Sequence, residues 1–179
     1  MTDEQNPGQA TPQPEGAAGA QLALQKIYTK DVSFEIPNAP QVFQEQGQAE
    51  IKLNLAQKVE PLGEDAEEIV LTITVTATIG EKTAYLAEVA QAGIFLVSGL
   101  DERTMHAVVN TLCPNTLFPY ARNAISNLVA DGGFPPLTLQ PINFEQLYAQ
   151  RMQQAAAEQQ NAAGEGGDET VQAEFTQNN

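Results

Sequence analysis

The sequence predicts an α+β fold, with a four-stranded antiparallel sheet followed by helices. Between Ile69 and Ile79 every odd position is apolar, and the even positions from 72 to 78 are threonine. This alternation is typical of a strand with one buried face. After Asp101 the apolar residues change to helical spacing. Because the strands precede the helices and do not alternate with them, the pattern favours α+β.

Four strands are expected, and each is identified by its own alternation. They cover residues 22–27 with a continuation over 32–36, residues 51–55, residues 69–79 and residues 83–95. Gly80 and Glu81 supply a hairpin turn between the last two strands. The polar segment 61–67 connects the second strand to the third.

The helical part is expected to begin with Asp101 and Glu102, whose charges complement a helix dipole. One apolar face follows, made of Met105, Val108, Val109 and Leu112. Pro114 and Pro119 then predict a tight turn, because a proline inside a helix removes a hydrogen bond. A helix led by Tyr120 is expected after the turn and ends at the segment 131–133.

A last helix is predicted after the extended segment 134–141. Asn143 precedes it, with Gln146 three residues later, which is a capping-box arrangement. Its apolar stripe contains Phe144, Leu147, Tyr148, Met152 and Ala155. The helix faces are broader than one sheet needs, so we expect helices to be buried between subunits. The alternative is a self-sufficient monomer.

The chain of 179 residues is long enough for one domain. We place this domain at residues 22–158. Residues 1–21 and 159–179 lack periodic apolar residues and are expected to be disordered tails. The N-terminus has no basic and apolar leader, and no apolar run reaches the length of a membrane span. A cytoplasmic protein is expected.

The formal net charge is −15, from 23 acidic and 8 basic residues. Nucleic acid and anionic membrane surfaces are therefore unexpected partners, because both attract clustered lysine and arginine. Basic partners and unfolded chains fit better. The single cysteine, Cys113, forms no intramolecular disulfide, which suits a reducing compartment.

Residues for catalysis are scarce, so an enzyme is not expected. His106 is the one histidine, and Cys113 stands at a helix entrance, where its pKa could be lowered. A Cys113–His106 pair is the minor alternative, a small enzyme. One histidine and one cysteine exclude an ordinary zinc site. The glycine pairs lack the context of a phosphate loop. Neither a cofactor nor a metal is expected.

Three motifs support a family resemblance. Residues 113–122 read CPNTLFPYAR, residues 28–35 read YTKDVSFE and residues 36–40 read IPNAP. Together they resemble the SecB protein-export chaperones over about residues 22–155. The resemblance implies a homotetramer, a dimer of dimers with helices packed between sheets. It also implies a chaperone that, without ATP, keeps preproteins unfolded and competent for translocation and delivers them to the SecA translocation ATPase.

The first candidate site is acidic. Asp31 and Glu35 share one face of an extended segment, and Leu86 and Glu88 share a face of the fourth strand. Such a surface suits a basic partner, although ordinary solvated residues of a sheet would look the same. The resemblance implies that these four residues dock SecA.

The second candidate site is apolar. Ile51, Leu53 and Leu55 form one strand face, and Tyr148 and Met152 lie one turn apart on the last helix. If the helix lies beside the strand, an exposed groove results, and exposed apolar surface marks binding sites. The alternative places these residues in the core. The resemblance implies a groove for unfolded preproteins.

The sequence departs from the family in one loop, and it also leaves a rival function open. Many family members have a tryptophan in the loop after residues 42–44, whereas residues 45–48 read EQGQ here and the chain has no tryptophan. The loop's contribution to client binding is therefore in doubt. The rival is a chaperone or adaptor of the same fold dedicated to one partner, such as a toxin–antitoxin system.

Overall fold

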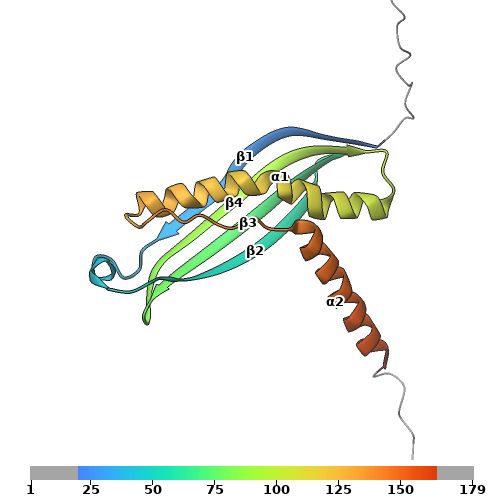
Figure 1. Cartoon of the computed structure of the whole chain (residues 1–179). Helices are drawn as coiled ribbons and strands as arrows, with labels where there is room; N and C mark the ends of the chain where they lie inside the picture. Colours follow the sequence, from blue (N-terminus) through green and yellow to red (C-terminus); the bar gives the residue numbers. More distant parts are fainter. Residues whose placement is uncertain (1–19, 165–179) are drawn as a thin grey trace, which may run out of the picture.

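The computed structural model describes residues 20–164 as one antiparallel sheet with helices on one side (Figure 1). The order of strands in the sheet is β1-β4-β3-β2. A single turn of 3-10 helix, Gln41–Gln44, lies between β1 and β2. The elements are β1 (Gln21–Glu35), β2 (Glu50–Pro61), β3 (Ala66–Ile79), β4 (Lys82–Ser98), α1 (Glu102–Asp131) and α2 (Phe144–Gly164).

The predicted strands are confirmed, and they are longer than the alternation alone indicated. The two expected pieces at the N-terminus form one strand, β1, which has irregularities between Leu24 and Lys26 and between Thr29 and Asp31. In β3 the odd residues from 69 to 77 are buried and the threonines are half-buried. Gly80 turns the chain into β4 with a φ of 61°, a conformation that favours glycine.

The expected turn at the prolines is wrong, because α1 runs without a break through Pro114 and Pro119. The missing N–H groups leave the helix with fewer hydrogen bonds. Nearby side chains bond to carbonyls one turn earlier, including Thr111 Oγ1 to Ala107 O and Thr116 Oγ1 to Leu112 O, both at 2.8 Å. Residues on both sides of the prolines pack against the sheet, and this packing offsets the free-energy cost of the missing hydrogen bonds.

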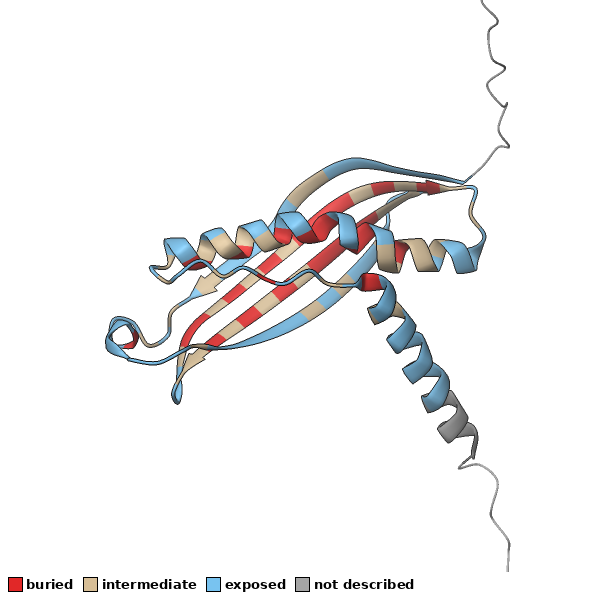
Figure 2. Cartoon of the chain, in the orientation of Figure 1, coloured by how far each residue is buried: buried red, intermediate tan, exposed pale blue. Residues whose placement is uncertain are grey.

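The core lies between α1 and the inner face of the sheet. Figure 2 shows the buried residues running along β3 and β4 beneath the helix. Gly93 of β4 lets the helix approach closely, since an added Cβ would lie 2.9 Å from Leu117 Cδ2. Ala121 is fully buried in this same core. This small residue lets α1 pack closely on the chain's own sheet.

α2 is attached mainly by its first turns. Asn143 Oδ1 accepts a hydrogen bond from the N–H of Gln146 at 2.9 Å, which confirms the predicted cap. Phe144 packs on Phe118 with ring centroids 5.9 Å apart, and residues 149–157 are all exposed. Most of both predicted tails, residues 1–19 and 165–179, lies outside the described residues. Residues 159–164 of the expected C-terminal tail belong to α2.

Candidate binding surfaces

The structure brings the four predicted acidic-site residues together. β1 pairs with β4 so that Ser33 lies opposite Glu88 and Glu35 lies opposite Leu86. Directly opposed residues project from the same face of a sheet. Residues 85, 87 and 89 of β4 are buried beneath α1, so Asp31, Glu35, Leu86 and Glu88 occupy the opposite, outer face. We call this set the acidic patch.

The carboxylates of the acidic patch are available to a partner. Glu88 Oε2 accepts a hydrogen bond from Thr74 Oγ1 at 2.7 Å, which orients the carboxylate without neutralising it. Asp31 and Glu35 are exposed. Among the described residues, no basic side chain lies within salt-bridge distance of Asp31, Glu35 or Glu88. The patch therefore offers carboxylates to an incoming basic group.

On the same outer face, two neighbouring lysines form ion pairs with glutamates. Lys30 Nζ donates to Glu68 Oε2 at 2.5 Å and lies 3.7 Å from Glu60 Oε2, and Lys58 also pairs with Glu60. Glu68 is nearly buried and also accepts a hydrogen bond from the Tyr28 hydroxyl. The hydrogen bonds from Lys30 and then Tyr28 lower the pKa of Glu68. These lysine charges are therefore engaged away from the patch.

The apolar residues of β2 lie on the inner face of the sheet, beside α1. Ile51, Leu53 and Leu55 pair with Ala77, Val75 and Ile73, which are all buried. Ile51 and Leu53 remain 39% and 44% exposed, because β2 is an edge strand that α1 does not cover. Leu55 is half-buried. The apolar face of the sheet therefore extends from the core onto β2, where it is exposed.

Tyr148 and Met152, the predicted residues of α2, line two hollows. Leu55 and Tyr148 line one small cavity of about 10 Å³, which also includes Leu147 and Arg151. Gln57 Nε2 bonds to Val109 O at 2.9 Å and ties β2 to α1 beside this cavity. Met152 lines a separate, open groove of about 720 Å³ between α1 and α2. Tyr148 borders both hollows, whereas Ile51 and Leu53 lie further along β2.

An aromatic row was missed by the sequence analysis. Phe34, Tyr85, Phe134 and Phe43 are in contact, with ring centroids 5.7, 4.9 and 5.1 Å apart along the row. Each contact joins two residues that are far apart in the sequence, so no local pattern could indicate the row. Phe43 is 51% exposed and lies just before the loop that lacks a tryptophan. Phe43 therefore supplies an exposed aromatic side chain beside this loop.

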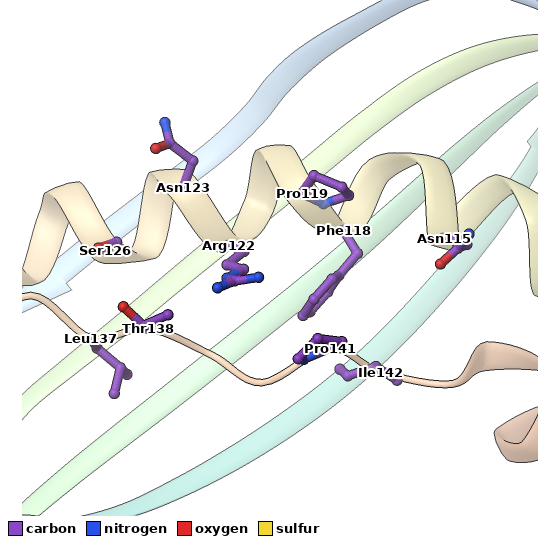
Figure 3. A pocket seen from close by; sticks show the side chains of 10 residues that line it. All are labelled: Asn115, Phe118, Pro119, Arg122, Asn123, Ser126, Leu137, Thr138, Pro141 and Ile142. Atoms are coloured by element: carbon purple, nitrogen blue, oxygen red, sulfur yellow. The ribbon is translucent and has the colours of Figure 1, made fainter.

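A further groove runs between α1 and the extended segment 134–143 (Figure 3). Its volume is about 500 Å³, and Phe118, Arg122 and Ile142 are among the residues that line it. The Arg122 guanidinium makes no salt bridge within the described part of the chain. No local motif indicated this groove, because Leu139 of the segment is buried in a core built from residues far away in the sequence.

The two residues considered for catalysis are not brought together as a reactive pair. Cys113 is buried, and this burial raises the pKa of its thiol to about 12, contrary to the lowered pKa considered for a helix entrance. His106 instead contacts Tyr148, with Nδ1 2.9 Å from the hydroxyl. The described residues contain no group of three potential metal-ligating side chains. None of the helices in this part of the chain is both long and apolar enough to cross a bilayer.

Comparisons with known proteins agree with the resemblance. The family model described as preprotein translocase subunit SecB matches residues 15–155. The protein-export protein SecB of Xanthomonas oryzae pv. oryzae is 53% identical over 154 residues, covering 86% of this chain and 90% of the relative. The SecB of Xylella fastidiosa is 51% identical over 156 residues, covering 87% and 90%.

A solved structure shares the fold. The SecB-like chaperone of Mycobacterium tuberculosis, solved in complex with an antitoxin peptide, matches with a TM-score of 0.54 and 22% identity, covering 70% of this chain and 91% of that one. The match extends over most of that chaperone, and the curated relatives are matched over nine-tenths of their length. The chain therefore belongs to the SecB family of protein-export chaperones.

Proposed function

We propose that the protein holds preproteins unfolded without ATP in the cytoplasm and passes them to the SecA translocation ATPase through the acidic patch. Membership of the SecB family supports the chaperone activity. The observation that carries the SecA step is the register of β1 and β4, which gathers Asp31, Glu35, Leu86 and Glu88 on one face. Within the described part of the chain, the carboxylates of Asp31, Glu35 and Glu88 have no basic partner, which suits them to a basic docking partner.

The client surface is proposed to lie on the other side of the sheet. Ile51, Leu53 and Leu55 form its strand edge, and Tyr148 and Met152 form its helical edge. Exposed apolar side chains of this kind bind clients of varied sequence, and methionine adapts to different shapes. Each contact is weak, but a long client that reaches several subunits binds tightly because later contacts are intramolecular.

We further propose a homotetramer, a dimer of dimers with helices between the sheets. Leu112 and Tyr120 on the outer side of α1 are 46% and 52% exposed. Leu24 and Val32 of β1 are 44% and 45% exposed. An isolated protomer would leave this apolar surface in water, whereas assembly would cover it. Light scattering on the purified protein tests the mass.

The experiment that tests the SecA step compares Glu88→Lys with Glu81→Lys. Both variants change the charge equally, but Glu81 lies in the turn between β3 and β4. Glu88→Lys should abolish SecA binding and spare capture of an unfolded preprotein, whereas Glu81→Lys should leave both intact. Equal loss of both activities in Glu88→Lys would contradict the division into two surfaces.

The client surface is tested with Leu53→Asn and Leu62→Asn. Both leucines are exposed, at 44% and 55%, but Leu62 lies in the turn after β2. Only Leu53→Asn should weaken the delay that the chaperone imposes on refolding of a slowly folding preprotein. Unchanged capture in Leu53→Asn would remove β2 from the client surface.

The second candidate function is a chaperone dedicated to one partner. The observation that favours it is the fold shared with the SecB-like chaperone of Mycobacterium tuberculosis, which was solved with an antitoxin peptide. A dedicated chaperone would ignore generic unfolded preproteins and capture one partner selectively. Competition between several unrelated unfolded proteins for capture separates the two functions, since a general chaperone shows similar affinities for all of them.

A further inference from the structure

α2 is joined to α1 by a side-chain hydrogen bond near its start, between Tyr148 and His106. Phe144 is buried at the start of the helix, Leu147 and Tyr148 are half-buried, and residues 149–157 are all exposed. The helix therefore projects from the body after its second turn, as Figure 1 shows. Among the described residues, the side-chain hydrogen bond furthest along α2 joins Tyr148 to His106 of α1.

The contact between these two side chains is well formed. His106 Nδ1 lies 2.9 Å from the Tyr148 hydroxyl, and the two rings are 5.5 Å apart between centroids at an angle of 50°. A polar bond and ring packing together fix both the distance and the direction of the tyrosine side chain. Tyr148 is thereby held between the small cavity shared with Leu55 and the open groove lined by Met152.

We propose that His106 is a positioning residue for the client surface. By holding Tyr148, it sets the direction in which α2 leaves the body and so places Met152 relative to β2. His106 itself need not touch a client. This inference rests on the proposed client surface, because it assigns the position of the helical edge of that surface.

The size of the effect follows from the kind of bond. A side-chain hydrogen bond at a partly exposed site contributes modestly to stability. Without it, the exposed part of α2 should open more often, by roughly threefold to tenfold. Global unfolding should change little, because β3 and β4 and the core above them do not involve this bond.

The test is hydrogen exchange of the backbone amides in residues 149–157 of the full-length assembled protein. Tyr148→Phe removes only the hydroxyl, and His106→Ala removes its partner. Each should speed exchange in this segment several-fold and leave residues 69–75 of β3 unchanged. His106→Asn keeps a polar atom near the position of Nδ1 and should restore slow exchange.

A double variant separates a direct bond from independent effects. If the two side chains act on each other, Tyr148→Phe adds nothing in the His106→Ala background. The inference would be overturned if Tyr148→Phe had its full effect on exchange in the His106→Ala background. Unchanged exchange in both single variants would also overturn it. Faster exchange with unchanged preprotein capture would support the role of His106 in positioning α2. The same result would contradict the separate proposal that α2 forms part of the client surface.

Discussion

Gly93→Ala tests whether α1 lies on the sheet as closely as the structure shows. The added methyl group would stand 2.7 Å from Phe95 Cε2 and 2.9 Å from Leu117 Cδ2. Ordinary carbon contacts are about 3.5–4.0 Å. Phe95 and Leu117 are 2% and 0% exposed, so neither side chain has free space into which it can move.

The expected result is a net loss of stability. Forcing a methyl group into a packed core costs about 1–3 kcal/mol. Replacing glycine inside a strand recovers about 0.5–1 kcal/mol of backbone entropy. At the midpoints of these two ranges, the free energy of unfolding falls by about 1 kcal/mol.

Urea unfolding at a fixed protomer concentration measures this loss, because the stability of an assembly depends on concentration. Gly63→Ala is the matched control, since no atom lies within 4 Å of the position of its added Cβ. The control should change stability by less than about 0.5 kcal/mol. A Gly93→Ala protein as stable as the parent would refute the close packing of α1 on β4.

Three further predictions follow from individual contacts. Because burial raises the pKa of the Cys113 thiol to about 12, alkylation at pH 8 should be slow in the native protein and fast in urea, and Cys113→Ala should preserve preprotein capture. Lys30 and Tyr28 lower the pKa of Glu68, so its stabilisation exists above the unfolded-state pKa and disappears as the pH falls through the folded-state pKa. Acid titration of unfolding should therefore be flatter in Glu68→Gln than in the parent. Asn143→Ala removes the cap of α2 and should cost about 1 kcal/mol of local stability, measured as faster amide exchange in residues 145–150.

The strands were predictable because their signal is local. Alternation between residues 69 and 79 needs only one buried face, and the structure has that face beneath α1. The continuity of α1 was not predictable from its own residues. Pro114 and Pro119 argue locally for a turn, whereas Val109, Leu117 and Ile125 pack on distant strands and hold one helix together.

The candidate surfaces were likewise predictable only where local pattern determines them. Asp31 and Glu35 share a face by simple alternation, but their approach to Glu88 depends on β1 pairing with β4, which is last among the strands in sequence. The direction of α2 depends on non-local contacts at Phe118 and His106. Sequence pattern therefore identified the apolar stripe of α2 without indicating that Tyr148 would border both hollows and Met152 only the open groove.

The placement of the two proposed surfaces on opposite faces of one sheet has an evolutionary consequence. Odd and even residues of one strand face opposite sides of the sheet, as with Leu53 on the inner face and Asn54 on the outer face of β2. Point substitutions can therefore alter one recognition property while leaving the other free to vary separately. An insertion or deletion of one residue cannot, since it exchanges the faces of every following side chain in the strand. Divergence within these strands should proceed by replacement, and changes in length should be confined to the turns.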